Sequence, residues 1–474
     1  MSRTVSAPDI QNEFLVDTHC HLQMEQFNGD LEEVIERARN SGVRSLILIG
    51  TDSRDNPEAL ALAEKKEFIH VAAGIHPHDA SSLDDRLLSE LRRWLSHPKV
   101  VAVGETGLDY HYMHSPREVQ RKAFMQHIEL AKQMNLPLVV HSREANDETM
   151  EILRMQSRDI GPGEKLRGVI HCFSGDRAMA ERAVEMGFYI SITGPVTYKK
   201  SEALRQVVKS IPIENMLLET DAPYLSPVPL RGKRNEPAYM VHTAQKIAEL
   251  KGLSLNDVAR ITSLNAHILF GIGEPAEKGR IAYRIRNSLY LNITNRCTSR
   301  CSFCAKDTDA FVKGHNLKLK KEPSADEIIQ AIGEPENCNE VVFCGYGEPL
   351  LRLDTVKYVA SWIKSKGLKV RVNTNGHANL IHKKNILSEL KGLVDVYSIS
   401  LNAQNRDIYN RICQPGIDRA WDGTVDFIRK AVQTGGAEVV ATVVDMPGVD
   451  TKECEKIAYS LGAKFRVRTF NVVG

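Results

Sequence analysis

The chain has 474 residues, which is enough for two or more domains that each bury a large hydrophobic core. Its 42% hydrophobic and 26% charged residues are typical of a globular protein and exclude a disordered one. No stretch approaches the roughly 18 apolar residues of a membrane-spanning helix, and the first eight residues lack the apolar core of a signal peptide.

Nine cysteines, an odd number that includes one tight cluster, argue against a disulfide framework. We therefore expect a protein of the reducing cytoplasm with no membrane partner. The net charge of +2 is unevenly distributed, because residues 1–279 carry 33 Lys and Arg against 39 Asp and Glu, whereas residues 280–474 carry 29 against 21. A basic second half is compatible with a polyanionic partner, although an ordinary solvated surface would give the same balance.

One segment rich in Gly, Pro and charge, Gly271-Ile-Gly-Glu-Pro-Ala-Glu-Lys-Gly279, divides the chain. We predict a flexible tail over residues 1–13 and a first domain over residues 14–270. A linker over residues 271–286 then leads to a second domain over residues 287–474.

Short β-rich runs alternate with helical stretches in the first domain. Residues 31–41, for example, have the pattern of an amphipathic helix that Gly42 would end. Eight strands separated by helices predict an α/β fold, a (β/α)8 TIM barrel, with its chemistry at the C-terminal ends of the strands. The predicted strands are 14–18, 44–50, 69–74, 100–104, 136–140, 168–170, 188–193 and 215–219.

Imidazole and carboxylate side chains lie at the ends of these strands. His19 and His21 are two residues apart just past the first strand, so in extended chain both rings point to the same side. Six such groups at five strand ends are enough for two divalent metal ions bridged by one carboxylate. The predicted metal ligands are His19, His21, Glu105, His141, His171 and Asp221.

The segments around these ligands resemble the TatD family, which comprises metal-dependent deoxyribonucleases within the amidohydrolase superfamily. They are Asp17-Thr-His-Cys-His21, Gly74-Ile-His-Pro-His78, Gly104-Glu-Thr-Gly-Leu-Asp-Tyr110, His141-Ser-Arg143, His171-Cys-Phe-Ser-Gly175 and Glu219-Thr-Asp-Ala-Pro-Tyr-Leu225. The resemblance implies that one metal is held by His19, His21, Glu105 and Asp221. It implies that the other metal is held by Glu105, His141 and His171.

These ligands suit phosphodiester hydrolysis. Two divalent ions would lower the pKa of a bridging water and clamp the phosphoryl oxygens for in-line attack. Glu105 and Asp221 are the predicted catalytic residues, with Asp221 as the proton acceptor. The ligand types leave the identity of the ions open among zinc, magnesium and manganese.

Three further residues are candidates for substrate contact. His76 would touch the scissile phosphate or an extra metal, or would serve only as a hydrogen-bonding loop histidine. Arg231 and Arg234 belong to Arg231-Gly-Lys-Arg-Asn-Glu-Pro237, which offers guanidinium groups to phosphate oxygens. TatD-like proteins carry a similar segment there, although a solvated basic loop is the alternative.

The second domain contains Cys297, Cys301 and Cys304 in a C-x3-C-x2-C pattern, directly after a predicted strand over residues 289–294. Three thiolates fill three corners of a cubane iron–sulfur cluster and leave the fourth iron open for a small molecule. A zinc knuckle is the alternative, but a fourth ligand at suitable spacing is missing. The scattered Cys338, Cys344, Cys413 and Cys454 are predicted to be buried free thiols.

Further β/α alternation follows, with strands at 340–344, 369–373, 394–400 and 438–444. The cysteine pattern, with Phe303 before the last cysteine, and the segment Gly345-Tyr-Gly-Glu348 together resemble the radical S-adenosylmethionine superfamily. That resemblance implies a partial (β/α)6 radical SAM barrel that binds a [4Fe-4S] cluster and S-adenosyl-L-methionine. It also implies an electron donor such as flavodoxin or ferredoxin.

By the same resemblance the methionine amino group would be lined by Gly345, Tyr346, Gly347 and Glu348, with Phe303 nearby. Later strand ends supply further candidates for ribose and carboxylate contacts, for which a turn or cap role is equally compatible. These are Asn373, Asn375, Ser400 and Asn402.

The sequence therefore favours a bifunctional enzyme that joins two-metal phosphodiester hydrolysis to radical chemistry on a nucleic acid or nucleotide substrate. An amidohydrolase-type enzyme is the first alternative, since a metal-activated hydroxide also attacks amides, esters or lactones, coupled here to modification of a small metabolite. The second alternative is that one half serves only as a binding platform. The sequence predicts no oligomeric state.

Overall fold

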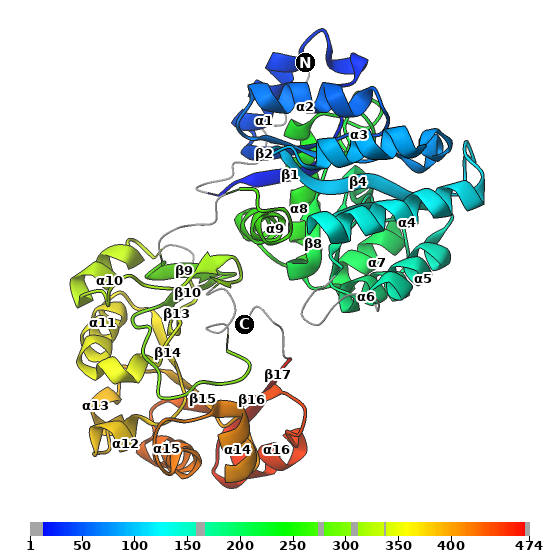
Figure 1. The fold of residues 1–474 in the computed structure, drawn as a ribbon. Helices are drawn as coiled ribbons and strands as arrows, with labels where there is room; N and C mark the ends of the chain where they lie inside the picture. The colour runs from blue at the N-terminus through cyan, green and yellow to red at the C-terminus, as the bar shows by residue number, and fades with distance from the viewer. Residues whose placement is uncertain (1–12, 158–165, 274–278, 305–310, 336–337, 470–474) are drawn as a thin grey trace. The chain divides into compact units, whose positions relative to one another are not determined.

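The fold is that of a computed structural model (Figure 1), which describes residues 13–157, 166–273, 279–304, 311–335 and 338–469. The chain divides into two compact units, Met1–Pro275 and Ala276–Gly474. The division lies inside the segment predicted as a linker. Part of that segment is nevertheless a strand, β9 (Ala282–Ile285), which pairs with its neighbour in the second unit.

Eight parallel strands form the sheet of the first unit, each hydrogen-bonded to the next in chain order. They are β1 (Leu15–Cys20), β2 (Val43–Ile49), β3 (Ile69–Ala73), β4 (Val100–Asp109), β5 (Leu138–Arg143), β6 (Gly168–Ile170), β7 (Phe188–Ile192) and β8 (Met216–Leu218). A parallel bridge between Cys20 and Ala222 joins the first strand region to the last. The predicted (β/α)8 barrel is confirmed.

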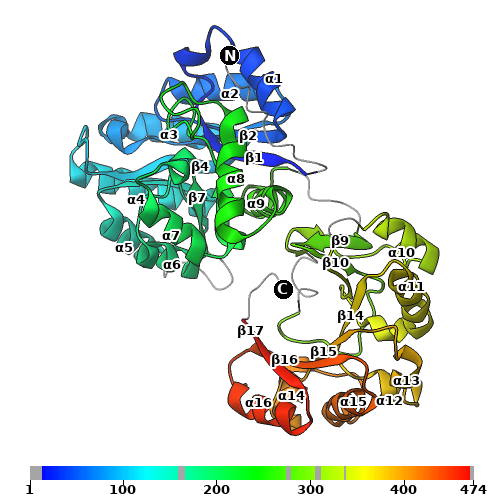
Figure 2. The same ribbon diagram turned by 180° about the vertical axis from the view of Figure 1, so that it is seen from behind.

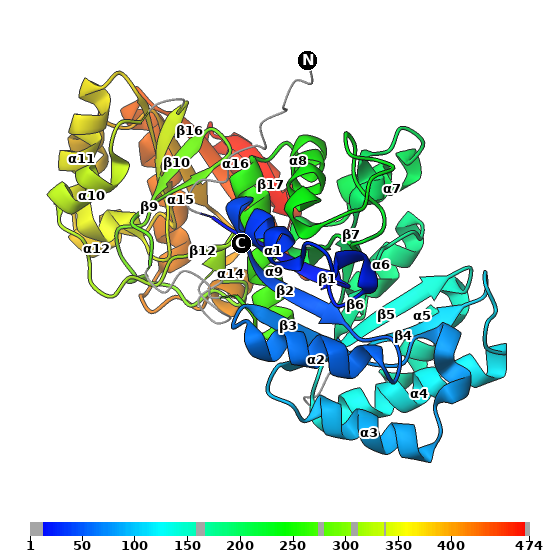
Figure 3. The same cartoon turned by 90° about the horizontal axis from the view of Figure 1, so that it is seen from above.

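Helices connect the strands and lie on the outer side of the barrel, as α2, α3 and α4 show in Figure 3. They are α1 (Leu31–Asn40), α2 (Asp55–Lys65), α3 (Asp85–Leu95), α4 (Arg117–Met134), α5 (Asn146–Gln156), α6 (Arg177–Glu185), α7 (Glu202–Ser210), α8 (Met240–Lys251) and α9 (Leu255–Phe270). The expected helix over 31–41 is α1, and Gly42 follows with a φ of 85°, a conformation that favours glycine.

Two hydrophobic layers hold the barrel together because successive strand residues face opposite sides. One layer packs the strands against the helices. The other fills the barrel interior, where Val16, Ala72 and Val139 meet Leu269 and Phe270 of α9. Because apolar side chains fill the barrel interior, a functional site can form only from the polar side chains at the strand ends.

The second unit contains a seven-stranded sheet in the order β17-β16-β15-β14-β13-β10-β9. Besides β9 these strands are β10 (Ser288–Leu291), β13 (Glu340–Phe343), β14 (Lys369–Thr374), β15 (Val396–Ser400), β16 (Glu438–Asp445) and β17 (Lys464–Thr469). The six strands from β10 to β17 pair in parallel, as expected for a partial (β/α)6 barrel, and β9 adds an antiparallel edge. A separate hairpin joins β11 (Phe311–Val312) to β12 (His315–Asn316).

Helices of the second unit lie along one face of this sheet (Figures 1 and 2). They are α10 (Ala325–Ile332), α11 (Leu353–Ser365), α12 (Ala378–His382), α13 (Leu387–Leu390), α14 (Arg406–Cys413), α15 (Ala420–Thr434) and α16 (Thr451–Ser460). Leu289, Val341, Val372 and Ala441 pack on that face. Strand residues between them, such as Tyr290, point to the other face.

Among the described helices, none combines the length and apolarity needed to cross a bilayer.

Candidate metal centre and cluster-binding loop

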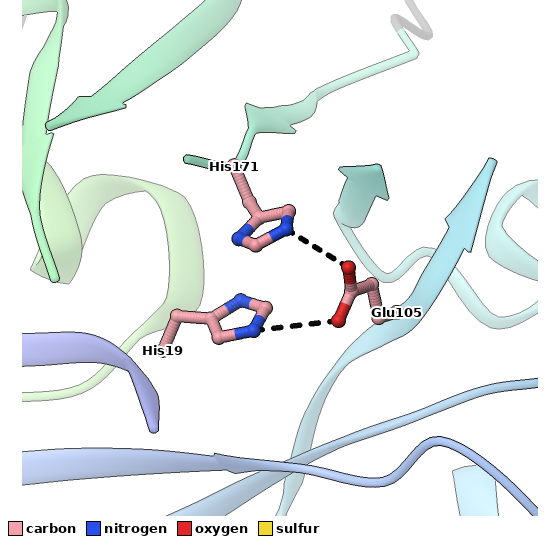
Figure 4. Close-up of side chains that lie close together, drawn as sticks. All are labelled: His19, Glu105 and His171. Atoms are coloured by element: carbon pink, nitrogen blue, oxygen red, sulfur yellow. Dashed lines mark ion pairs between the residues drawn. The ribbon is translucent and has the colours of Figure 1, made fainter. Parts of the chain in front are cut away.

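Glu105 lies at the centre of a cluster of histidines at the C-terminal ends of the barrel strands. Its Oε1 is 2.9 Å from Nε2 of His171, and its Oε2 is 3.4 Å from Nε2 of His19 (Figure 4). Nδ1 of His141 is 2.8 Å from the same Oε1. One carboxylate thus faces imidazoles from three other strand ends.

The prediction placed Glu105 just after a strand, but it lies inside one. β4 continues to Asp109, and its register with β5 shifts between Val103 and Thr106. Such an irregularity re-aims a side chain without ending the strand. The apolar run that indicated this strand in the sequence ends at Gly104, whereas the strand itself continues to Asp109.

Asp221 completes a second group of donors with the two histidines of the first strand end. Its Oδ1 is 3.5 Å from Nε2 of both His19 and His21. Both ring nitrogens of His19 and Nδ1 of His21 are buried without a hydrogen-bond partner in the described part of the chain. Buried polar atoms without partners are rare, and a cation held by these nitrogens would satisfy them. These residues therefore fit divalent metal ions.

Three overlapping groups have donor atoms within 4.8 Å of one another: His19, Glu105 and His171; His19, His21 and Asp221; and His76, Glu105 and His141. All six predicted ligands are brought together. The groups differ from the two sets that the resemblance implies, because His171 lies with His19 and because His76 joins Glu105 and His141. His76 is therefore part of the donor cluster, with Nε2 at 3.5 Å from Oε1 of Glu105.

The negative charge of the Glu105 carboxylate favours cation binding. Burial by itself would raise the pKa of Glu105, but the charges of His171, His76 and His19 and a hydrogen bond from His141 lower this pKa well below its usual value. Burial lowers the pKa of His19, and although burial also opposes it, the neighbouring carboxylates raise the pKa of His171, His141 and His21. An ionised carboxylate and a neutral imidazole are the forms that bind metals.

Two further carboxylates lie behind the histidines and orient their rings, as hydrogen-bonded carboxylates do for the histidines of metal sites. Asp109 Oδ2 lies 3.0 Å from Nε2 of His141 and 3.1 Å from Nε2 of His78. Glu219 Oε1 lies 3.4 Å from Nδ1 of His171. The sequence reasoning did not assign Asp109 and Glu219 a role, although both belong to the segments that carry the TatD resemblance.

The two arginines predicted to bind phosphate differ in their surroundings. Arg234 donates from both terminal nitrogens to the carboxylate of Asp30, each at 2.7 Å, and lies over the ring of Phe27. Arg231 lies over the ring of Tyr198, with its guanidinium carbon 4.4 Å from the centroid. Arg234 is thus engaged within the protein, and Arg231 is the better candidate for substrate contact.

We expect Arg234→Ala to lower the free energy of unfolding by about 1 kcal/mol, because a two-bond ion pair near the surface is lost. We expect Arg231→Ala to leave the stability within error and to raise KM for a phosphodiester. Urea unfolding and steady-state kinetics of both variants check this. A raised KM for Arg234→Ala at unchanged stability would contradict the assignment.

The cysteine loop is hydrogen-bonded to the C-terminal end of α14 and to the segment that follows it. Ser302 donates its backbone N–H to Ile412 O at 2.8 Å, and Gly416 N–H donates to Thr298 O at 2.8 Å. The thiol of Cys413 is buried and hydrogen-bonded to that of Cys301. Cys413 was predicted to be a buried free thiol, and its place beside the cluster ligands could not be read from its spacing.

Three thiols on one short loop fit an iron–sulfur cluster. None of the nine cysteines, all of which lie in the described residues, forms a disulfide, and Cys297 is exposed while Cys301 and Cys304 are half-buried. Phe303 packs in the hydrophobic cluster that also contains Cys301 and Cys413. The loop therefore presents thiols on an apolar support, which is the donor set such a cluster requires.

The loop after β13 packs directly against the strand that leads into the cysteines. A Cβ added to Gly345 would lie 2.2 Å from Asn292 Oδ1, and one added to Gly347 would lie 2.3 Å from Arg296 O. Tyr346 N–H donates to Asn292 Oδ1 at 2.9 Å. Only glycine permits these close approaches, which place Glu348 beside the cluster loop.

Glu348 is buried and accepts hydrogen bonds from Leu350 N–H at 3.0 Å, Thr374 Oγ1 at 2.8 Å and Asn375 N–H at 2.8 Å. Burial raises the pKa of Glu348 to about 7 although these bonds oppose the shift. Asn375 in turn donates from Nδ2 to Thr298 Oγ1 at 2.9 Å. Glu348 thus holds Asn375 against the cysteine loop.

The remaining predicted contacts lie at strand ends of the same sheet. The side chain of Asn373 is hydrogen-bonded to Cys344, and Ser400 is the last residue of β15. Asn402 donates from Nδ2 to Cys413 Sγ at 3.5 Å. The Oδ1 atoms of Asn373 and Asn402 are buried without a hydrogen-bond partner in the described residues, which suits contact with a bound molecule.

Comparisons with known proteins identify a family for each of the two units. The family model described as TatD related DNase matches residues 16–271, and the model of the radical SAM superfamily matches residues 291–459. The metal-dependent hydrolase YabD of Bacillus subtilis is 43% identical over 258 residues, which are 54% of this chain and 99% of YabD.

Two further proteins resemble the first unit. The 3'-5' ssDNA/RNA exonuclease TatD of Erwinia amylovora is 36% identical over 54% of this chain and 100% of its own length. The crystal structure of YJJV, a TatD homologue from Escherichia coli, superposes with a TM-score of 0.51 at 32% identity, over 55% of this chain and 98% of that one. The chain belongs to the family of TatD-related DNases, metal-dependent hydrolases, and its second unit is a radical SAM domain.

Proposed function

We propose that this protein is a bifunctional enzyme, which hydrolyses phosphodiester bonds in its first unit and carries out radical SAM chemistry in its second. The observation that supports hydrolysis most strongly is Glu105, whose carboxylate faces His171, His19 and His141 at 2.8–3.4 Å. A carboxylate shared between donor groups is the arrangement that bridges two metal ions.

In the hydrolytic site, two divalent ions, zinc, magnesium or manganese, would supply Lewis-acid activation of a water and of the phosphoryl oxygens. His19, His21, His141 and His171 would hold them, with Glu105 between. Although burial opposes it, the hydrogen bond from His21 and the neighbouring imidazole charges lower the pKa of Asp221, so its carboxylate is ionised and able to accept the proton of the attacking water.

In the radical site, a [4Fe-4S] cluster and S-adenosyl-L-methionine would supply a 5′-deoxyadenosyl radical after one-electron reduction by a donor such as flavodoxin or ferredoxin. Cys297, Cys301 and Cys304 would hold the cluster. The close-packed loop Gly345–Gly347 would present its backbone to the methionine group, and Glu348 would fix Asn375 beside it. The protein's part is to bind, orient and exclude water.

A nucleic acid or nucleotide is the proposed substrate of both sites. Support comes from the exonuclease name of the Erwinia amylovora relative and from the basic balance of residues 280–474. The lack of disulfides among the nine cysteines, all within the described residues, is compatible with a cytoplasmic location.

The proposal is tested with the reconstituted full chain in two separate assays. We expect His19→Ala to remove hydrolysis of a phosphodiester reporter and to leave deoxyadenosine formation intact. Cys297→Ala should do the reverse, because the two sites share no residue. Faster hydrolysis of an ester or lactone panel than of DNA, RNA or nucleotides would instead favour an acyl hydrolase. Retention of both activities in both variants would refute the proposal.

A further inference from the structure

The last strand of the second unit carries two arginines on the face of the sheet opposite the helices. Phe465 of β17 packs against the hydrophobic core of the helix face. Because strand residues alternate, Arg466 and Arg468 point to the other face, next to their register partners Thr442 and Val444 of β16.

Neither arginine has a carboxylate partner in the part of the chain that the structure describes. Other cations on the same sheet do: Lys464 Nζ lies 2.9 Å from Glu438, and Arg371 binds both carboxylate oxygens of Glu340. Like charges two residues apart on one strand face repel each other. A bound anion would remove this repulsion.

Arg468 lies near the cysteines of the predicted cluster. The pKa of Arg468 is lowered by loss of hydration and by the charge of Arg466, while Cys344 and Cys301 are close enough to oppose the shift. Cys301 is a predicted cluster ligand, and Cys344 follows β13 and contacts Asn373, whose Oδ1 is buried without a partner. Arg468 and Asn373 thus both lie near Cys344.

We propose that Arg466 and Arg468 form a binding site for an oxyanion, a phosphate or carboxylate group of a molecule held beside the cluster. Two guanidinium groups on one face of a strand offer several N–H donors, which suit the oxygens of such a group. The oxyanion belongs either to the methionine carboxylate of S-adenosylmethionine or to an acidic radical substrate. The location beside a cluster rests on the function proposed above, whereas anion binding by the pair does not.

The test compares Arg466→Gln/Arg468→Gln with Lys464→Gln, which loses a charge from the same strand and face. Binding of S-adenosylmethionine and of inorganic phosphate is measured separately on the reconstituted full chain by calorimetry. Loss of the two charge-assisted hydrogen-bond donors should weaken the binding of S-adenosylmethionine or of phosphate by about tenfold or more. Phosphate binding at the first unit is common to all variants and cancels in the comparison.

Weakened S-adenosylmethionine binding would assign the site to the cofactor's carboxylate, and weakened phosphate binding alone would assign it to a substrate group. The variant Arg466→Lys/Arg468→Lys keeps both charges but loses the paired N–H donors of the guanidinium groups. Its affinity should lie between those of the wild type and the glutamine variant. Affinities equal to those of Lys464→Gln for both probes would overturn the inference. Iron content and deoxyadenosine formation of the wild type are measured alongside, so failure of the cluster proposal is recognised separately.

Discussion

Glu105→Gln is expected to abolish hydrolysis while leaving the fold of the first unit intact. The amide keeps the shape of the side chain but removes the negative charge that faces His171, His19 and His141. Metal ions contribute several kcal/mol of transition-state stabilisation, and a loss of about 4 kcal/mol corresponds to a roughly thousandfold decrease in kcat/KM.

Metal content by mass spectrometry and hydrolysis of a phosphodiester reporter measure this effect. Glu144→Gln is the matched control, because Glu144 is an exposed glutamate of the same barrel that pairs with His111 at 2.7 Å. We expect the control to keep both metal content and rate. Full metal occupancy in Glu105→Gln would show that the carboxylate is not the shared ligand.

The histidine and carboxylate cluster was predictable because most of its residues lie at the ends of recognisable apolar strands, although Glu105 lies inside β4. The barrel topology then brings residues as distant as His19 and Asp221 to within 3.5 Å. The grouping of donors was not predictable, since it depends on where each ring points. His76 illustrates this, because its distance from Glu105 follows from a loop whose path no sequence periodicity describes.

Contacts between distant loops were likewise beyond the sequence. Cys413 reaches Cys301 only because α14 ends against the cysteine loop, a packing that spacing along the chain does not encode. Arg234 looked like a phosphate ligand because its partner, Asp30, is 204 residues away. Local patterns predicted the strands, while the partners of charged and polar groups required the fold.

Strand ends show the same limit on a smaller scale. Strand β10, which precedes the cysteines, ends at Leu291 rather than near residue 294. Asn292 there donates from Nδ2 to Arg280 O and Leu317 O and accepts from Tyr346 N–H at Oδ1. That asparagine ties the loop after β13 to the strand before the cysteines. Both segments that are proposed to bind the cluster and its cofactor therefore depend on one buried side chain.

The ligand set of the proposed cluster can be separated from its thiol neighbour by two matched substitutions. Cys301→Ser should reduce iron and sulfide from about four of each per chain to near zero after anaerobic reconstitution, because a hydroxyl is a poor ligand for this cluster. Deoxyadenosine formation should disappear with it. Hydrolysis by the first unit should stay unchanged.

Cys413→Ser makes the same sulfur-to-oxygen change at a buried thiol hydrogen-bonded to Cys301. We expect it to retain about four irons, since in the proposed cluster the three loop cysteines would hold three corners and the fourth iron would stay open for S-adenosylmethionine. Iron analysis and electron paramagnetic resonance with and without S-adenosylmethionine compare the two variants. Loss of iron in both would make Cys413 a fourth ligand, and an iron left without an open position would argue against radical chemistry at this loop.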